Sequence, residues 1–252
     1  MISTFNKVFS QHNNLKYHEA KTSNDPVVTL EIQPARAPTY QLLRGNYIIL
    51  DKLKMSDIAP LYQLTHGSLE LEKVWEYLPY GPFENIESMQ VHYQKYINTK
   101  DKLVFCVKDR KTNAPIGIVC LSECKPEMGN IEIASVTYPI KYQKSEANTE
   151  AVYLLITYCI NQLDFRKIVW RCNNNNLESK KAAIRLGFEF EGLFYKHMIV
   201  KGKNRDTAWY GIIDTKWRFL EKNYQIWLSE PNPKNRRSLY EMNSHVDRYS
   251  KL

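Results

Sequence analysis

The sequence predicts a mixed α/β fold, in which a central, mostly antiparallel sheet of about seven strands is flanked by helices. Three strand-like runs, at 103–109, 115–123 and 130–138, follow one another through turns short enough for hairpins. Two helical patterns then enclose a strand at 167–172, and two final strands meet at the basic turn 201–206. The predicted order is β-α-α-β-β-β-α-β-α-β-β.

The elements before these runs follow from local signals. A first strand is predicted at 46–53, where apolar residues suit a sheet. Ser56 or Asp57 then caps a helix that is expected to end at Gly67. Pro60 is tolerated in this helix because it falls near the first turn.

Four more helices are predicted further along the chain. The long apolar pattern after Tyr142 gives one, a short helix spans 176–186 and is closed by Gly187, and a last helical stretch runs over 217–227. The remaining helix, the second in chain order, is indicated by apolar residues that share one face: Ile86, Met89, Tyr93, Tyr96 and Ile97.

Length and composition are those of a globular protein with a sizeable core: 252 residues, 43% hydrophobic and 25% charged. We expect a polar N-terminal extension at 1–38, one domain at 39–228, and a polar, basic and mobile tail at 229–252. No run approaches the roughly 18 apolar residues of a membrane span, and the start lacks an apolar signal-peptide core. These absences predict a cytoplasmic protein without a membrane partner.

Cysteines and charge narrow the possible functions. The five cysteines form no CxxC pair and no zinc-like spacing with histidine, so reduced core residues and no metal are expected. A net charge of +8 would suit nucleic acid, but basic and acidic residues alternate along the chain and no nucleic-acid motif is present. We favour a solvated basic surface that helps to hold a polyanionic cofactor, with nucleic-acid binding as the less favoured alternative.

Five strings of residues are distinctive: VWEYLPYGPF (74–83), NIEIASVTYP (130–139), TEAVYLL (149–155), AAIRLGFEFEGLF (182–194) and KGKNRDTAWYGIID (201–214). Together with the order of elements, they resemble the GCN5-related N-acetyltransferase (GNAT) superfamily, and within it the RimJ/RimL-type branch, over residues 38–228. The resemblance implies the GNAT fold, acetyl-CoA as co-substrate, and direct attack on the thioester, in a ternary complex, by a primary amine of a peptide N-terminus or small molecule.

The stretch YQKSEANTEA, residues 142–151, falls where this superfamily binds the pyrophosphate of the cofactor. A helix N-terminus suits an anion because its first N–H groups are unpaired and its dipole is favourable. The alternative is an ordinary helix capped by Ser145 or Asn148. The resemblance assigns the following residues to the cofactor: Gln143, Lys144, Ser145, Glu146, Ala147 and Asn148.

Glu146 is the main departure from the family pattern, because it stands where a glycine is usual. A carboxylate about 6 Å from a phosphate charge costs about 0.7 kcal/mol in water and about 3 kcal/mol at an effective dielectric constant of about 20. We therefore predict that Glu146→Arg tightens acetyl-CoA binding. The alternative function is a catalytically weak GNAT-fold sensor or interaction module with impaired acetyl-CoA binding.

The resemblance implies further contacts with the cofactor. The strand backbone at Val136, Thr137 and Tyr138 would pair with the pantetheine arm and offer an N–H group to the thioester carbonyl, unless this is an ordinary antiparallel strand. Asn176 and Ser179 match an N-x-x-S motif. Asn176 would cap a helix and reach the pantetheine, and Ser179 would protonate the leaving thiolate; the alternative is that both serve only the helix start.

A general base has to accept the proton of the attacking amine, ideally with a pKa raised towards neutrality. Glu132 is the best candidate. Its alternatives are a structural pairing with Arg171, or a water chain that carries the proton to solvent. His66, His92 and His197 are expected to be structural or surface residues.

Aromatic residues gather in the segment that walls the acceptor site of this fold. Such residues line pockets or hold a cation over their rings, and core packing is an equal alternative. Arg205 and Asp206 are expected to pair with each other rather than face the acceptor groove. The sequence does not specify the acceptor, because specificity lies in variable loops. It does not specify the oligomeric state either, because no surface strand or helix identifies itself as an interface. The predicted pocket residues are Trp75, Tyr77, Tyr80 and Phe83.

Overall fold

The computed structural model describes residues 33–244, so most of the expected N-terminal extension and the last eight residues, 245–252, lie outside the described part. Eight strands form one sheet in the order β1-β2-β3-β4-β5-β6-β8-β7. Every neighbouring pair is antiparallel except β5 and β6. The mixed sheet is confirmed. The strands are β1 (Leu43–Arg44), β2 (Ile48–Lys52), β3 (Leu103–Asp109), β4 (Pro115–Lys125), β5 (Asn130–Thr137), β6 (Lys167–Asn173), β7 (Glu189–Val200) and β8 (Lys203–Ile213).

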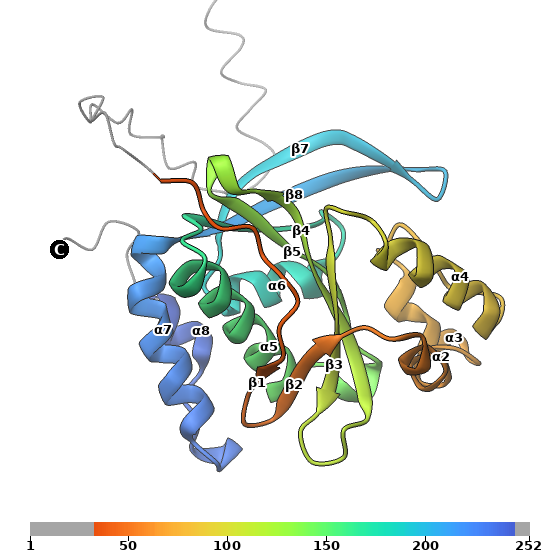
Figure 1. Ribbon diagram of the computed structural model, residues 1–252, viewed down its shortest axis with the longest axis horizontal. Coiled ribbons are helices and arrows are strands. Elements are labelled where there is room, and N and C mark those ends of the chain that lie inside the picture. The colour runs from red at the N-terminus through yellow and green to blue at the C-terminus, as the bar shows by residue number, and fades with distance from the viewer. Residues whose placement is uncertain (1–32, 245–252) are drawn as a thin grey trace, which may run out of the picture. The chain divides into compact units, whose positions relative to one another are not determined.

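Helices cover both faces of the sheet (Figure 1). Helices α5 to α8 lie on one side and α2 to α4 on the other, each group with its own buried cluster of apolar side chains. This is why β3 and β4 read as continuous apolar runs rather than alternating ones. The helices are α2 (Ile58–Thr65), α3 (Leu69–Glu72), α4 (Ile86–Ile97), α5 (Glu146–Thr157), α6 (Leu177–Arg185), α7 (Asp214–Ser229) and α8 (Leu239–Ser244).

The two parallel strands stay together only at their start. β5 and β6 pair from Asn130 to Glu132 and then separate. Beyond this point β5 follows β4 with a shifted register, in which Ser135 and Val136 fall between the paired residues. Ser135 takes a left-handed backbone with φ of 52°. Such a bulge bends a strand and increases its twist, and the sheet therefore opens between β5 and β6.

The start of α5 is fixed to the turn between β1 and β2 through a buried carboxylate. Glu150 accepts hydrogen bonds from the backbone N–H groups of Asn46, Tyr47 and Ile48 at 2.6, 2.7 and 2.9 Å. Gly45 is required in this turn, because a Cβ atom there would lie 2.2 Å from the carboxyl carbon of Glu150. The first turns of α5 are therefore held in place from outside the helix.

The chain after α7 folds back onto the domain. Leu239 of α8 is only 2% exposed, and the Asn243 amide donates to the carbonyl of Arg185 at 3.0 Å. A mobile tail was expected from the polar composition. Residues 233–244 instead pack against the domain, because a few side chains supply contacts that the polar composition does not indicate. The boundary near residue 228 stays a prediction.

The segment before β1 also packs on the domain. The backbone N–H groups of Ala35 and Arg36 donate to the carbonyls of Pro126 and Leu163 at 3.0 and 2.8 Å. Among residues 33–244, no helix is long and apolar enough to cross a membrane. The five cysteines are free thiols, as predicted, and all but Cys124 are buried.

Candidate active site

A cavity of about 500 Å3 opens where β5 and β6 separate. Residues 132–136 of β5 and residues 170–173 of β6 form its two sides. The segment 74–79 and the β7–β8 hairpin complete the walls, and the hairpin reaches towards the helices α2 to α4 (Figure 1). Lys201 at the hairpin tip donates to the carbonyl of Trp75 at 2.7 Å, which fastens these last two walls together.

The backbone assigned to the pantetheine arm leads from this cavity to α5. Val136 lines the cavity, whereas the side chains of Thr137 and Tyr138 are buried. The carbonyl of Tyr138 accepts a hydrogen bond from the Gln143 amide at 3.0 Å, and the Tyr138 hydroxyl lies 3.4 Å from the carbonyl of Ala147. The end of β5, the loop and the start of α5 therefore form one connected unit.

The N-terminus of α5 carries no side-chain cap. Ser145 occupies the cap position, but its hydroxyl donates back to the carbonyl of Tyr142 at 2.6 Å. Lys144 turns the chain into the helix with a left-handed φ of 56°. Asn148 does not cap either, and within the described residues its Oδ1 atom is buried without a partner. Capping by Ser145 or Asn148 is thus not observed, and the helix end fits an anionic group.

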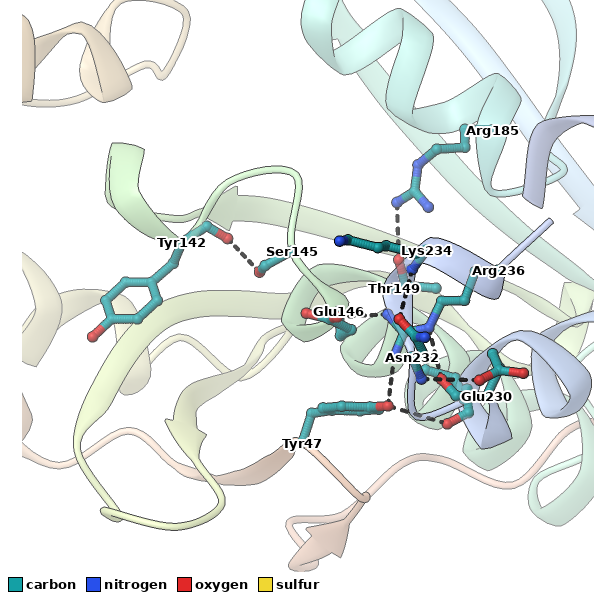
Figure 2. Close-up of polar contacts among 11 residues, drawn as sticks. Tyr47, Tyr142, Ser145, Glu146, Thr149, Arg185, Glu230, Asn232, Lys234 and Arg236 are labelled. Atoms are coloured by element: carbon teal, nitrogen blue, oxygen red, sulfur yellow. Dashed lines mark hydrogen bonds and ion pairs between the residues drawn. The ribbon is translucent and has the colours of Figure 1, made fainter. Parts of the chain in front are cut away.

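Glu146, the unusual acid of this loop, is bound by an arginine from beyond α7 (Figure 2). Arg236 Nη1 lies 2.5 Å from Glu146 Oε1, and Nη2 donates to the Tyr47 hydroxyl at 2.7 Å. The Arg236 side chain is 6% exposed and lies over the ring of Trp227, 4.6 Å from its centroid. The arginine is held tightly enough to stay opposite the carboxylate.

The ion pair with Arg236 reduces the repulsion that Glu146 would exert on an anion bound at this helix end. Burial alone would raise the pKa of Glu146, but hydrogen bonds from its own N–H group and from Arg236, with the charge of Arg236, hold it below the ordinary value. Glu146 is thus a carboxylate whose charge Arg236 compensates. The expectation that Glu146→Arg tightens acetyl-CoA binding rested on an uncompensated acid, and the structure removes that premise.

Glu132 is paired with Arg171 on the neighbouring strand. Arg171 Nε donates to Oε1 at 2.9 Å, and Nη2 makes a second, shorter bond to Oε2, to which the Ser122 hydroxyl also donates at 3.2 Å. The bond to Glu132 raises the pKa of Arg171 above its ordinary value. Both oxygens of the candidate base are thus occupied, although the residue lines the cavity.

Asn176 and Ser179 meet at the start of α6, and both line the cavity. Asn176 Oδ1 caps the helix by accepting from the N–H group of Ser179 at 3.0 Å. Ser179 Oγ accepts from the indole Nε1 of Trp170 at 3.1 Å. Because the hydroxyl oxygen already accepts from Trp170, its own O–H group can act as a donor, and the Cys172 thiol is one group within its reach.

Only one of the four predicted pocket aromatics lies at the cavity. Tyr77 lines it, whereas Trp75 is fully buried and its indole donates to the carbonyl of Thr65 at 3.2 Å. Tyr80 and Phe83 pack against the smaller core cluster around α2 and α4. This segment folds back on itself, so most of its aromatic rings fill the core and leave Tyr77 at the surface of the cavity.

The last hairpin supplies residues that the sequence interpretation placed wrongly. Arg205 was expected to pair with Asp206, but Asp206 accepts from the N–H group of Lys196 at 2.7 Å and from the Asn204 amide at 2.8 Å. Arg205 lines the cavity together with Thr207. The sequence could have indicated that Arg205 and Asp206 point away from each other, because alternate residues of a strand share a face and neighbouring residues do not.

The histidines add little chemistry to the cavity. His66 is structural, with Nε2 accepting from the N–H group of Phe83 at 2.9 Å. His197 lines the cavity and lies 3.0 Å from the Thr207 hydroxyl. Among residues 33–244, no group of three or more His, Cys, Asp or Glu side chains could hold a metal ion.

Known proteins are similar to this chain in both sequence and architecture. Residues 48–189 match the family described as acetyltransferase (GNAT) domain. A GCN5-related N-acetyltransferase from Brucella melitensis superposes with a TM-score of 0.80 at 30% identity, covering 85% of this chain and 99% of that one. A probable GNAT acetyltransferase from Chromobacterium violaceum gives 0.71 at 29% identity, covering 77% and 96%. The curated "Uncharacterized N-acetyltransferase YnaD" of Bacillus subtilis (strain 168) is 23% identical over 171 residues, 68% of this chain and 95% of the relative.

The fold and the opened sheet define an acyltransferase. The chain belongs to the GNAT family of acetyltransferases, and it is an N-acetyltransferase of the EC 2.3.1 class. Members of this family use acetyl-CoA as the acetyl donor. The predicted superfamily is thereby confirmed.

Proposed function

We propose that the protein transfers the acetyl group of acetyl-CoA to a primary amine, by direct attack in a ternary complex, and that it belongs to the RimJ/RimL-type branch. The observation that carries the proposal is the separation of β5 from β6 beyond Glu132, which opens a cavity that Val136 lines. The branch is supported by the strings at 74–83 and 201–214.

The proposed cofactor contacts run along a continuous surface. The N–H groups of the first turn of α5, preceded by the loop from Gln143 to Ser145, would bind the pyrophosphate. The β5 backbone from Val136 to Tyr138 and the amide of Asn176 would hold the pantetheine arm. The uncapped helix end and the compensated Glu146 both fit this use.

Acetyl-CoA supplies an activated acyl group, and the protein positions it and manages the protons. The N–H group of Val136 would polarise the thioester carbonyl, as an oxyanion-stabilising donor. A C–N bond forms to the acyl carbon while the C–S bond breaks. The Ser179 hydroxyl would donate its proton to the departing sulfur, which its acceptor bond from Trp170 leaves it able to do.

The amine has to lose one proton, and Glu132 is the proposed acceptor, with a water chain to solvent as the alternative. Glu132→Gln separates them because it keeps the shape and removes the charge. If Glu132 is the base, the variant loses about 100-fold or more in kcat together with the acidic limb of the pH–rate profile. If the role of Glu132 is structural, the variant is less stable, because Arg171 loses its charged partner, and the acidic limb is unchanged.

An acetyl-transfer screen tests the proposed function. N-terminal peptides, amino acids, polyamines and aminoglycosides are offered with acetyl-CoA, and release of free thiol is measured. We expect turnover of at least one class and a fall of about 100-fold in kcat for Ser179→Ala. The sensor alternative predicts no thiol release above hydrolysis from any acceptor, and would replace the proposal if that is found.

A further inference from the structure

The charged side chains that line the cavity are unevenly paired. Glu132 and Glu123 both bind Arg171, the first through two hydrogen bonds and the second at 3.5 Å. Lys102 and Arg205 line the same cavity and form no ion pair with a carboxylate in the described part of the chain. The excess charge of the cavity is therefore positive.

The Arg205 side chain has no hydrogen-bond partner within residues 33–244, whereas its backbone pairs with Met198 of β7. Its Nε atom is buried and unsatisfied, and burial lowers the pKa of the guanidinium below its ordinary value. Burying a cation without a partner costs free energy, and an anion that binds to it recovers part of this cost. Lys102 differs, because its ammonium group lies over the ring of Tyr96, 4.1 Å from the centroid. Arg205 is thus the stronger candidate for an anion-binding group.

The position of Arg205 points to the acceptor rather than to the cofactor. Arg205 lies on β8, in the wall that also contains His197 and Thr207. The phosphates of acetyl-CoA are proposed to bind at the first turn of α5, and no residue of that turn lines the cavity. An anion bound at Arg205 would therefore belong to the second substrate.

We infer that the acceptor is a primary amine that also carries a carboxylate, and that Arg205 binds this carboxylate. This inference rests on the proposed acetyl transfer and adds the acceptor class. A guanidinium is suited to the role because its planar N–H donors match the two oxygens of a carboxylate. A polyamine would bring further positive charge towards Lys102 and Arg205, so the same side chains disfavour it.

Matched pairs of acceptors test the inference. Each pair differs only in a carboxylate and its amide: β-alanine and β-alaninamide, 4-aminobutyrate and 4-aminobutyramide, and the peptide amides Ala-Asp-Ala and Ala-Asn-Ala. Binding to the CoA-saturated protein is measured by thermal shift, and turnover by thiol release. The first two pairs represent amino acids and the third an acidic peptide, so the source of the carboxylate is also distinguished. Spermidine serves as the polycation.

We expect at least one acid to bind about tenfold or more tightly than its amide, in line with a charge-assisted hydrogen bond. Arg205→Met should remove this preference, and Arg205→Lys should restore part of it. Lys203→Met is the matched control, because it removes one exposed positive charge from the same strand. The control should keep the preference of the wild type.

Three results would overturn the inference. They are equal binding of acid and amide by the wild type in every pair, tighter binding of spermidine than of any acid, or a loss of CoA affinity in Arg205→Met that matches its loss of acceptor affinity. The first two need only the wild-type protein and its binding, so they stand even if a variant fails to fold. Failure of the proposed function looks different, because acids would then bind without any thiol release.

Discussion

Two glutamates near the proposed site are each held by an arginine, but the buried partner differs. In the pair of Glu132 and Arg171, the carboxylate is the buried member, with 7% of its side chain exposed against 21% for the arginine. In the pair of Glu146 and Arg236 the order is reversed, with 27% exposed for the carboxylate and 6% for the arginine. Removal of the arginine is therefore expected to cost more free energy in the first pair than in the second, because the charge that is left behind is more deeply buried.

The pairs also differ in origin. Glu132 and Arg171 come from neighbouring strands of the sheet, so the fold itself brings them together. Arg236 lies 90 residues from Glu146 and reaches it only because the chain folds back after α7. We interpret Arg236 as the compensation that allows an acid in the loop that we propose to bind the pyrophosphate.

The largest effect is expected from Arg171→Met. This change leaves the Glu132 carboxylate buried without its partner, and should lower the free energy of unfolding by about 3–5 kcal/mol. Urea unfolding measures it. Arg205→Met is the matched comparison and should be neutral or slightly stabilising, because the Arg205 guanidinium is partly buried and its Nε atom has no partner among residues 33–244. Equal losses in the two variants would contradict the assignment of partners.

A smaller effect is expected from Arg236→Met. The variant loses the hydrogen bonds to Glu146 and Tyr47 but keeps an apolar chain over Trp227, and Glu146 can turn towards water. We expect a loss of about 1–3 kcal/mol in the free energy of unfolding. Arg237→Met, on the exposed neighbour, should change it by less than about 0.5 kcal/mol. If the two variants unfold alike, the Arg236 contacts contribute nothing to stability.

The smallest effect is a pH dependence at Glu146. The pKa of this carboxyl lies below its ordinary value of 4.5 in the folded protein. Its stabilising contribution is therefore complete above the unfolded value, and it is lost as the pH falls through the lower, folded value. The difference in melting temperature between wild type and Glu146→Gln should shrink below about pH 4.5. A difference that stays constant down to pH 3 would show that the charge of Glu146 is irrelevant.

Local sequence patterns predicted those elements whose formation depends on nearby residues. The hairpin strands, the caps at Asn176 and Gly187, and the helix start after Tyr142 follow from spacing and turn chemistry, and the structure contains them. Trp75, Tyr80 and Phe83 show the limit, since the same aromatic residues suit a pocket or a core and only the fold decides. Strand alternation would have placed Arg205 at the cavity.

Arg236 could not have been predicted from the sequence. Its partner is distant in the chain, and the segment around it is polar, which is typical of a solvated tail. Leu239 and Asn243 fix that segment through contacts that leave no periodic signal in so short a stretch. The departure at Glu146 was visible in the sequence, whereas its compensation appeared only in three dimensions.

The most direct test is the affinity for acetyl-CoA, measured by calorimetry on wild type, Arg236→Met and the double variant Glu146→Gln/Arg236→Met. We predict that the wild type binds, and that Arg236→Met, with its acid uncompensated, binds about 3- to 100-fold more weakly. The double variant should regain most of the wild-type affinity, because it removes the acid as well. No binding to the wild type at millimolar acetyl-CoA, or equal affinity in wild type and Arg236→Met, would contradict the account.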